Sequence, residues 1–190
     1  MDSSELRSRL ESHQRESYGW ALCCCSRDPA EAENVLQAAY LKVLEGKARF
    51  DGRSAFKTWL FSVIRKTAAD ERRRRFFRRL RLTAYAQGAG RGARVEGLDE
   101  TVYRSEMRDL FRRALAALPR RQAEVLQLVF YHDLSLSEAA EVMCVSLGSA
   151  RTHYERGKRR LRGLLTESGA FDEPGRERNP APVPRAEAGG

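Results

Sequence analysis

The sequence predicts an all-α protein made of two small helical domains joined by a flexible linker. Three observations support this prediction. Apolar residues recur three and four positions apart in two long blocks, which is the period of a helical face. No stretch alternates polar and apolar residues as a half-buried strand would. Between the blocks, residues 85–98 contain several glycines and almost no large apolar residue, which favours a flexible linker. We therefore expect domains at residues 6–82 and 101–166, a linker at 83–100 and a disordered tail at 167–190.

The first domain is expected to be helical throughout. Asp28 precedes Pro29, an arrangement typical of a helix start, because the carboxylate can cap free backbone N–H groups and proline fits the first turn. Two apolar stripes at helical spacing follow. The first consists of Val35, Leu36, Ala39, Tyr40, Val43 and Leu44, and the second of Phe56, Trp59, Leu60, Val63 and Ile64.

The second domain has the layout of a helix-turn-helix. After Pro119, residues 122–131 are apolar at helical spacing, and Ser135 with Glu138 has the spacing of a capping box. A brief turn at residues 144–146 separates the short helix that follows from a longer basic helix beginning after Ser146. On the long helix the predicted packed side consists of Ala150, Tyr154, Gly157, Leu161 and Leu165.

The other side of this long helix is a candidate DNA-reading surface. The chain carries a net charge of +9, which favours a polyanionic partner, either nucleic acid or an anionic membrane surface. An isolated basic helix is more often simply solvated, but the capped helix and turn before it favour DNA binding. The side chains placed to reach base edges and phosphates are Ser149, Arg151, Thr152, His153 and Arg156, with Lys158 and Arg159 as phosphate contacts.

Nothing in the sequence indicates catalysis, a cofactor or a membrane span. There is no phosphate loop, nucleophile–base pair or paired-carboxylate site, and no apolar stretch of roughly 18–20 residues. The N-terminus lacks the pattern of a secretory signal, so we expect a cytoplasmic protein. The consecutive cysteines Cys23, Cys24 and Cys25 point in different directions around a helix and cannot all bind one metal ion in normal geometry. We expect these cysteines to be buried or half-buried and to pack as small hydrophobic residues. The alternative is that two of them form a redox or metal sensor.

Both domains resemble the same protein family. Residues 118–126 read LPRRQAEVL and, with residues 134–165, resemble sigma region 4. Residues 28–44 and 50–75, which include DPAEAENVLQAAYLKVL and FKTWLFSVIRKTAADERRRR, resemble sigma region 2. Together these motifs resemble the extracytoplasmic-function (group IV) sigma factors of RNA polymerase.

The resemblance implies three partners: core RNA polymerase (through its β′ clamp helices and β flap), promoter DNA and an anti-sigma factor. The helix-turn-helix would read the −35 element. The segment 49–67 would capture and melt the −10 element, with Trp59 more suited to core packing than to nucleotides. The implied −10 contacts are Arg53, Ser54, Lys57, Arg65 and Lys66. The implied polymerase contacts are Asn34, Gln37, Tyr40, Leu41 and Lys42.

The sequence also departs from the family pattern. Asn34 and Ala38 stand where carboxylates usually face the polymerase, and Thr67 replaces an asparagine near the −10 segment. Cys144 replaces a glycine in the turn, and Gly157 replaces a common alanine in the reading helix. Two other hypotheses remain: a stand-alone helix-turn-helix regulator that binds DNA as a dimer, and a sigma-like module that binds only proteins.

Overall fold

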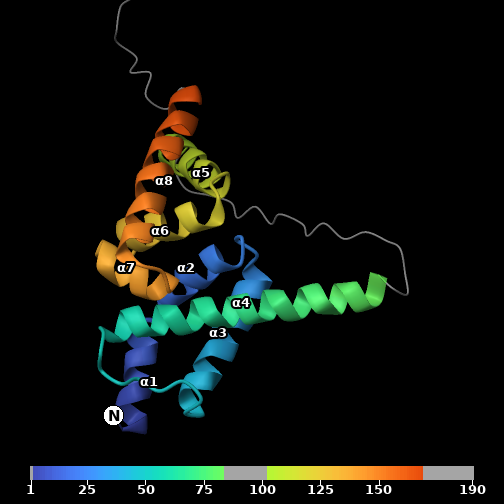
Figure 1. Cartoon of the computed structure of the whole chain (residues 1–190), viewed down its shortest axis with the longest axis vertical. Coiled ribbons are helices and arrows are strands. Elements are labelled where there is room, and N and C mark those ends of the chain that lie inside the picture. Colours follow the sequence, from blue (N-terminus) through green and yellow to red (C-terminus); the bar gives the residue numbers. More distant parts are fainter. Residues whose placement is uncertain (1, 84–101, 169–190) are drawn as a thin grey trace, which may run out of the picture.

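The computed structural model describes residues 2–83 and 102–168, and this part of the chain is entirely helical (Figure 1). In chain order the helices are α1 (Ser3–Ser12), α2 (Gln14–Cys24), α3 (Pro29–Leu44), α4 (Phe56–Thr83), α5 (Val102–Ala116), α6 (Arg120–Phe130), α7 (Leu136–Met143) and α8 (Leu147–Glu167). The all-α prediction is confirmed for these residues. Nearly all of the predicted linker and tail lies outside them.

Helices α1 to α4 form the first domain, in which α2, α3 and α4 pack on one another. Asp28 caps α3 as expected, because its Oδ1 accepts a hydrogen bond from the Glu31 amide at 3.0 Å. The fully buried Trp20 ties α2 to α4: its indole Nε1 donates to the Phe61 carbonyl at 3.0 Å. The rings of Trp20 and Phe61 also stack, with centroids 5.8 Å apart. These contacts fix the face of α4 that meets the rest of the domain.

Helices α5 to α8 form the second domain, and α7, the turn after it and α8 make the predicted helix-turn-helix. Ser135 and Glu138 form a complete capping box at the start of α7. Cys144 ends α7 in the left-handed conformation at φ 53°, and Ser146 then caps α8. The turn in which the family resemblance implies a glycine is therefore built here with a cysteine in a conformation that favours glycine. The predicted packed side of α8 is confirmed: Ala150, Gly157, Leu161 and Leu165 are buried and Tyr154 is half-buried.

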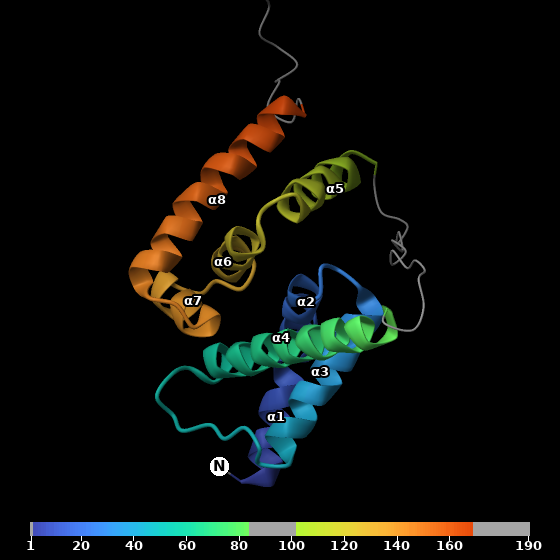
Figure 2. The same cartoon turned by 45° about the vertical axis from the view of Figure 1, so that its right-hand side comes forward.

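The two domains are packed against each other. α7 lies on the N-terminal half of α4, and α6 contacts α2 (Figures 1 and 2). One hydrophobic cluster joins Trp20 and Phe61 of the first domain to Val125, Leu128 and Met143 of the second. We call this contact, between α2 and α4 of the first domain and α6 and α7 of the second, the seam. Sequence periodicity did not predict it, because a periodic pattern indicates which face of a helix is apolar and not which partner covers that face.

Candidate nucleic-acid and polymerase interface

The candidate −35 surface is the outward side of α8. Ser149, Arg151, Thr152 and Arg156 are exposed, and His153 is half-buried. The Thr152 hydroxyl donates to the Gly148 carbonyl at 3.0 Å. Among the described residues, neither Arg151 nor Arg156 has an ion-pair partner, so both guanidinium groups are available to an anionic ligand. This side of the helix therefore presents donors that suit phosphate oxygens and base edges.

The two predicted phosphate contacts further along α8 differ in their surroundings. Lys158 Nζ lies 3.1 Å from Glu155 Oε1 and 4.7 Å from the centre of the Tyr154 ring. Arg159 is exposed. Lys158 is thus already partly neutralised, whereas Arg159 adds its full charge to the surface.

The structure divides the candidate −10 residues into two groups. Arg53 and Lys66 are exposed, and Arg53 is held near the loop by Asp51, whose Oδ2 lies 3.2 Å from its Nε. Ser54 is half-buried beside Arg53 in that loop. Lys57 and Arg65, in contrast, are both mostly buried and ion-paired to other parts of the chain.

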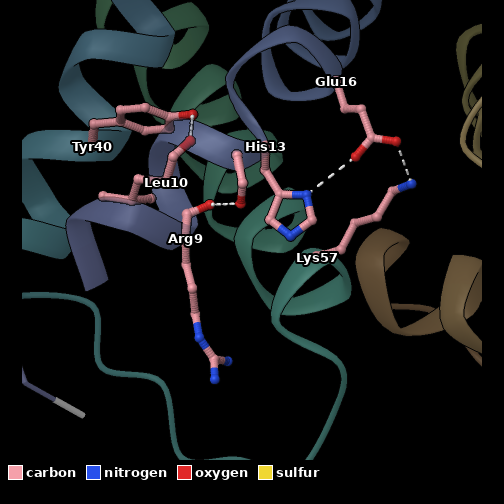
Figure 3. Close-up of polar contacts among 7 residues, drawn as sticks. Arg9, Leu10, His13, Glu16, Tyr40 and Lys57 are labelled. Carbon is pink, nitrogen blue, oxygen red and sulfur yellow. Dashed lines mark hydrogen bonds and ion pairs between the residues drawn. The ribbon is translucent and has the colours of Figure 1, made fainter. Parts of the chain in front are cut away.

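Lys57 belongs to a small polar network between α2 and α4 (Figure 3). Its Nζ donates to Glu16 Oε1 at 2.7 Å, and His13 Nδ1 lies 3.2 Å from the other oxygen of Glu16. Partial burial alone would raise the pKa of Glu16, but the hydrogen bonds from Lys57 and His13 lower it below its ordinary value. The carboxylate is therefore a stable anionic partner for Lys57.

Arg65 crosses the seam to a buried carboxylate. Its Nε donates to Glu124 Oε2 at 3.1 Å, while Arg120 Nε donates to Glu124 Oε1 at 2.7 Å. The Glu124 side chain is 0% exposed. Nearby, the Thr58 hydroxyl donates to Glu138 Oε1 at 3.4 Å. The helix-turn-helix domain therefore covers part of the α4 surface that the family likeness assigns to the −10 element.

Sequence reasoning missed Glu124. The residue stands in the apolar run QAEVLQLVF, where a charge at a buried helical position requires a partner. That signal indicates that Glu124 has a partner, but not that one of its two partners, Arg65, lies in the other domain.

The candidate polymerase surface is the outer face of α3. Asn34, Gln37 and Leu41 are exposed there. Tyr40 is half-buried, and its hydroxyl donates to the Leu10 carbonyl at 3.1 Å (Figure 3). Lys42 points towards α4 instead, with its Nζ 3.1 Å from Thr67 Oγ1. A shallow cleft of ≈ 310 Å³ adjoins this face, lined by Gln14, Tyr18, Glu33, Leu36, Gln37 and Tyr40.

The three adjacent cysteines are interior residues. Cys24 and Cys25 are buried and Cys23 is half-buried, which confirms their prediction as small hydrophobes. Burial raises the pKa of Cys23 and of Cys25 to about 12, so both are neutral thiols at pH 7. Among the described residues, no group of His, Cys, Asp or Glu is arranged to hold a metal ion. Nor is any helix in these ranges long and apolar enough to cross a bilayer.

Comparison with protein families matches both domains. Residues 10–77 match the family model for sigma-70 region 2, and residues 108–161 match that for sigma-70 region 4. The chain is 32% identical over 158 residues to the ECF RNA polymerase sigma factor SigX of Bacillus subtilis, covering 80% of this chain and 81% of that one. It is 26% identical over 150 residues to a probable RNA polymerase sigma factor of Haemophilus influenzae, covering 72% and 77%.

Two solved structures share the fold. One is the sigma factor RpoE in complex with the anti-sigma factor NepR from Bartonella quintana, with a TM-score of 0.66 and 20% identity over 85% of this chain and 97% of that chain. The other is CnrH in complex with the cytosolic domain of CnrY, with a TM-score of 0.58 and 19% identity over 87% of this chain and 90% of that chain. Both likenesses extend over the two domains.

Proposed function

The chain belongs to the ECF sigma factors of RNA polymerase, and from this premise we propose how its residues share the work of promoter recognition. As a member of this family it is a transcription initiation factor that directs core polymerase to specific promoters. The observation that carries the assignment of roles is that Arg151 and Arg156 are exposed on the capped helix α8 and have no ion-pair partner in the part of the chain that the structure describes. We expect it to act in the cytoplasm, without catalysis of its own.

The outward side of α8 reads the −35 element. A helix of this kind fits the major groove, where its N-terminal half meets base edges. Arg151 and Arg156 contact bases or phosphates, and Arg159 contacts the backbone. Ser149, Thr152 and His153 add shorter polar contacts on the same side.

The start of α4 and the loop before it bind the −10 element. Arg53 and Lys66 can do so without rearrangement because they are exposed, and the half-buried Ser54 lies beside Arg53 in the same loop. Lys57 and Arg65 must first exchange their carboxylate partners for DNA phosphates. Stacking on aromatic side chains and contacts to a basic surface are the usual means of holding single-stranded DNA.

Promoter binding requires the seam to open. The −35 and −10 elements are two separate stretches of promoter DNA, and each reading domain contacts one of them. In the closed arrangement Arg65 of one reading domain touches Glu124 of the other. The two domains must therefore separate for each to reach its own element.

The protein partners follow from the family likeness and the exposed surfaces. The surface of α3 that binds the β′ clamp helices consists of Asn34, Gln37, Tyr40 and Leu41. Lys42 contributes indirectly, because it contacts Thr67 of α4. The second domain would meet the β flap. One structural neighbour is a sigma factor in complex with an anti-sigma factor, and we propose that an anti-sigma factor likewise binds this chain.

A transcription assay with purified components tests these roles. It contains bacterial core polymerase, this protein and promoter fragments from the source genome, including the region upstream of its gene. We expect promoter-specific transcripts that disappear in the double variant Arg151→Ala/Arg156→Ala and persist in Arg162→Ala, an exposed arginine further along α8.

Two outcomes would overturn the assignment. A chain that shifts DNA as a dimer but neither binds core polymerase nor starts transcripts is a stand-alone regulator. A double variant with unchanged activity indicates a protein-binding module that does not read DNA through α8.

A further inference from the structure

His132 lies at the centre of the seam. It belongs to the turn between α6 and α7, and its side chain enters the first domain, where the residue is only 5% exposed. Its ring meets the Phe61 ring edge-on at 4.7 Å between centroids and the Trp20 ring at 6.1 Å. A Cβ built on Gly19 would lie 3.9 Å from His132 Cε1, so the imidazole packs directly over the α2 backbone.

Within the described ranges, neither ring nitrogen of His132 has a hydrogen-bond partner. Trp20 Nε1 provides none, because it already donates to the Phe61 carbonyl. Buried polar groups are almost always hydrogen-bonded, and an unpaired one costs free energy. A phenylalanine would fill the same aromatic site without that cost. The ring nitrogens of His132 thus make no polar contact with the described residues that would hold the two domains together.

The charged groups around the ring do not offset its burial. Lys57 faces it from α4, Glu16 from α2, and Asp133 from its own turn. Burial lowers the pKa of His132 from 6.5 to about 4; Lys57 acts in the same direction, and Glu16 and Asp133 act against it. Lys57 and Glu16 are also paired with each other at 2.7 Å, so neither is a free counter-charge for an imidazolium.

We propose that the seam is an acid-releasable latch, in which protonation of His132 separates the helix-turn-helix domain from the first domain. A charged imidazolium there would be buried against Phe61 and Trp20, with no hydrogen-bond acceptor among the described residues. Separation returns the ring to solvent and at the same time frees Arg65 from Glu124. The benefit to promoter binding rests on the function proposed above; the opening itself does not.

The direction and size of the effect follow from proton linkage. The closed form binds the proton less readily than the open form, so it is favoured above pH 6.5 and loses that advantage as the pH falls towards 4. With these two values, the opening equilibrium constant should rise about tenfold between pH 7.5 and 5.5. Falling pH therefore populates the form in which both reading surfaces are accessible.

Amide hydrogen exchange on the full-length chain, followed by NMR, tests the latch without polymerase or DNA. The seam reporters are the Trp20 indole N–H and the Leu134 amide, which donates to the Leu128 carbonyl at 3.1 Å. Buried amides of α3, such as that of Val35, serve as the internal reference. After correction for intrinsic exchange rates, the wild-type reporters should lose about tenfold protection between pH 7.5 and 5.5. The His132→Phe variant should lose none. Equal losses in both proteins would overturn the proposal.

A second measurement does not depend on the variant folding. The chain has three histidines, so the His132 ring signals can be followed through a pH titration of the wild-type protein. We expect a midpoint at least one pH unit below 6.5; a midpoint at 6.5 would contradict the latch. Failure of the proposed sigma function would appear in the transcription assay instead, with the exchange data unchanged.

Discussion

Arg65 of α4 and Glu124 of α6 form an ion pair at 3.1 Å, although 59 residues of chain separate them. The carboxylate is completely buried and also receives Arg120 at 2.7 Å, so it has a cation from each domain. Arg65 is also a candidate for binding the −10 DNA. Under the proposed function, Glu124 holds in the closed arrangement the guanidinium group that a DNA phosphate would bind in the open one.

Replacing Glu124 with glutamine should destabilise the protein by about 2 kcal/mol, because two partly buried guanidinium groups lose their shared counter-charge. Thermal or urea unfolding monitored by circular dichroism measures this. The control is Glu71→Gln, which removes an exposed pair with Arg74 at 2.8 Å and should change stability by no more than ~0.5 kcal/mol. Equal stability of Glu124→Gln and wild type would show that the buried pair contributes nothing.

Gly157 allows α8 to approach α6 closely. A Cβ at this position would lie 3.1 Å from Leu126 Cδ1 and 3.3 Å from the Gln122 carbonyl oxygen, which is backbone and cannot easily move. Gly157→Ala should therefore lower stability by about 1 kcal/mol, despite the better helix propensity of alanine. Gly163→Ala is the matched control on the same helix. It meets nothing within 4 Å and should gain about 0.5–1 kcal/mol. A gain in both variants would contradict the close contact.

Cys144 holds a left-handed backbone conformation at φ 53° in the turn between α7 and α8. Replacing it with glycine should raise the free energy of unfolding by about 1 kcal/mol, because glycine adopts this conformation without a steric penalty. Cys144→Ala removes the thiol but keeps the strain, so it should give no such gain. If both variants were equally stable, the strain would not lie in the backbone.

Ser135 should stabilise the start of α7 in a pH-dependent way. Hydrogen bonds from the Ser135 hydroxyl and amide hold the pKa of Glu138 below its ordinary value of 4.5. This contribution is present above pH 4.5 and is lost as the pH falls through the lowered pKa. Ser135→Ala should cost about 1 kcal/mol at pH 7 and less at pH 3. Ser137→Ala, an exposed neighbour in α7, should cost much less at either pH. A pH-independent loss would mean that the carboxylate takes no part in the cap.

Much of the fold was predictable from local patterns. The caps at Asp28, Ser135 and Ser146, and the buried side of α8, follow from residue type and helical spacing alone. The separation of the chain into two domains followed from composition. Such features depend on neighbours within one helix or one turn, which the sequence displays directly.

The surroundings of the candidate site residues were less predictable. The sequence indicated that Lys42, Lys57 and Arg65 are basic, but not that each is held by a partner in another helix. These partners depend on how helices distant in sequence pack together. For Gly157 the sequence indicated only a cost in helix propensity, whereas the structure supplies a packing reason for the glycine.

The hydrophobic cluster that spans the seam has a consequence for how the protein unfolds. Because Trp20 and Phe61 share one apolar interior with Val125 and Leu128, the described helices should melt cooperatively in a single transition. Opening the seam divides that interior and brings apolar side chains into contact with water. An opened chain outside the polymerase would therefore tend to self-associate. By covering these side chains with its own second domain, the closed arrangement should lower the tendency of the chain to self-associate.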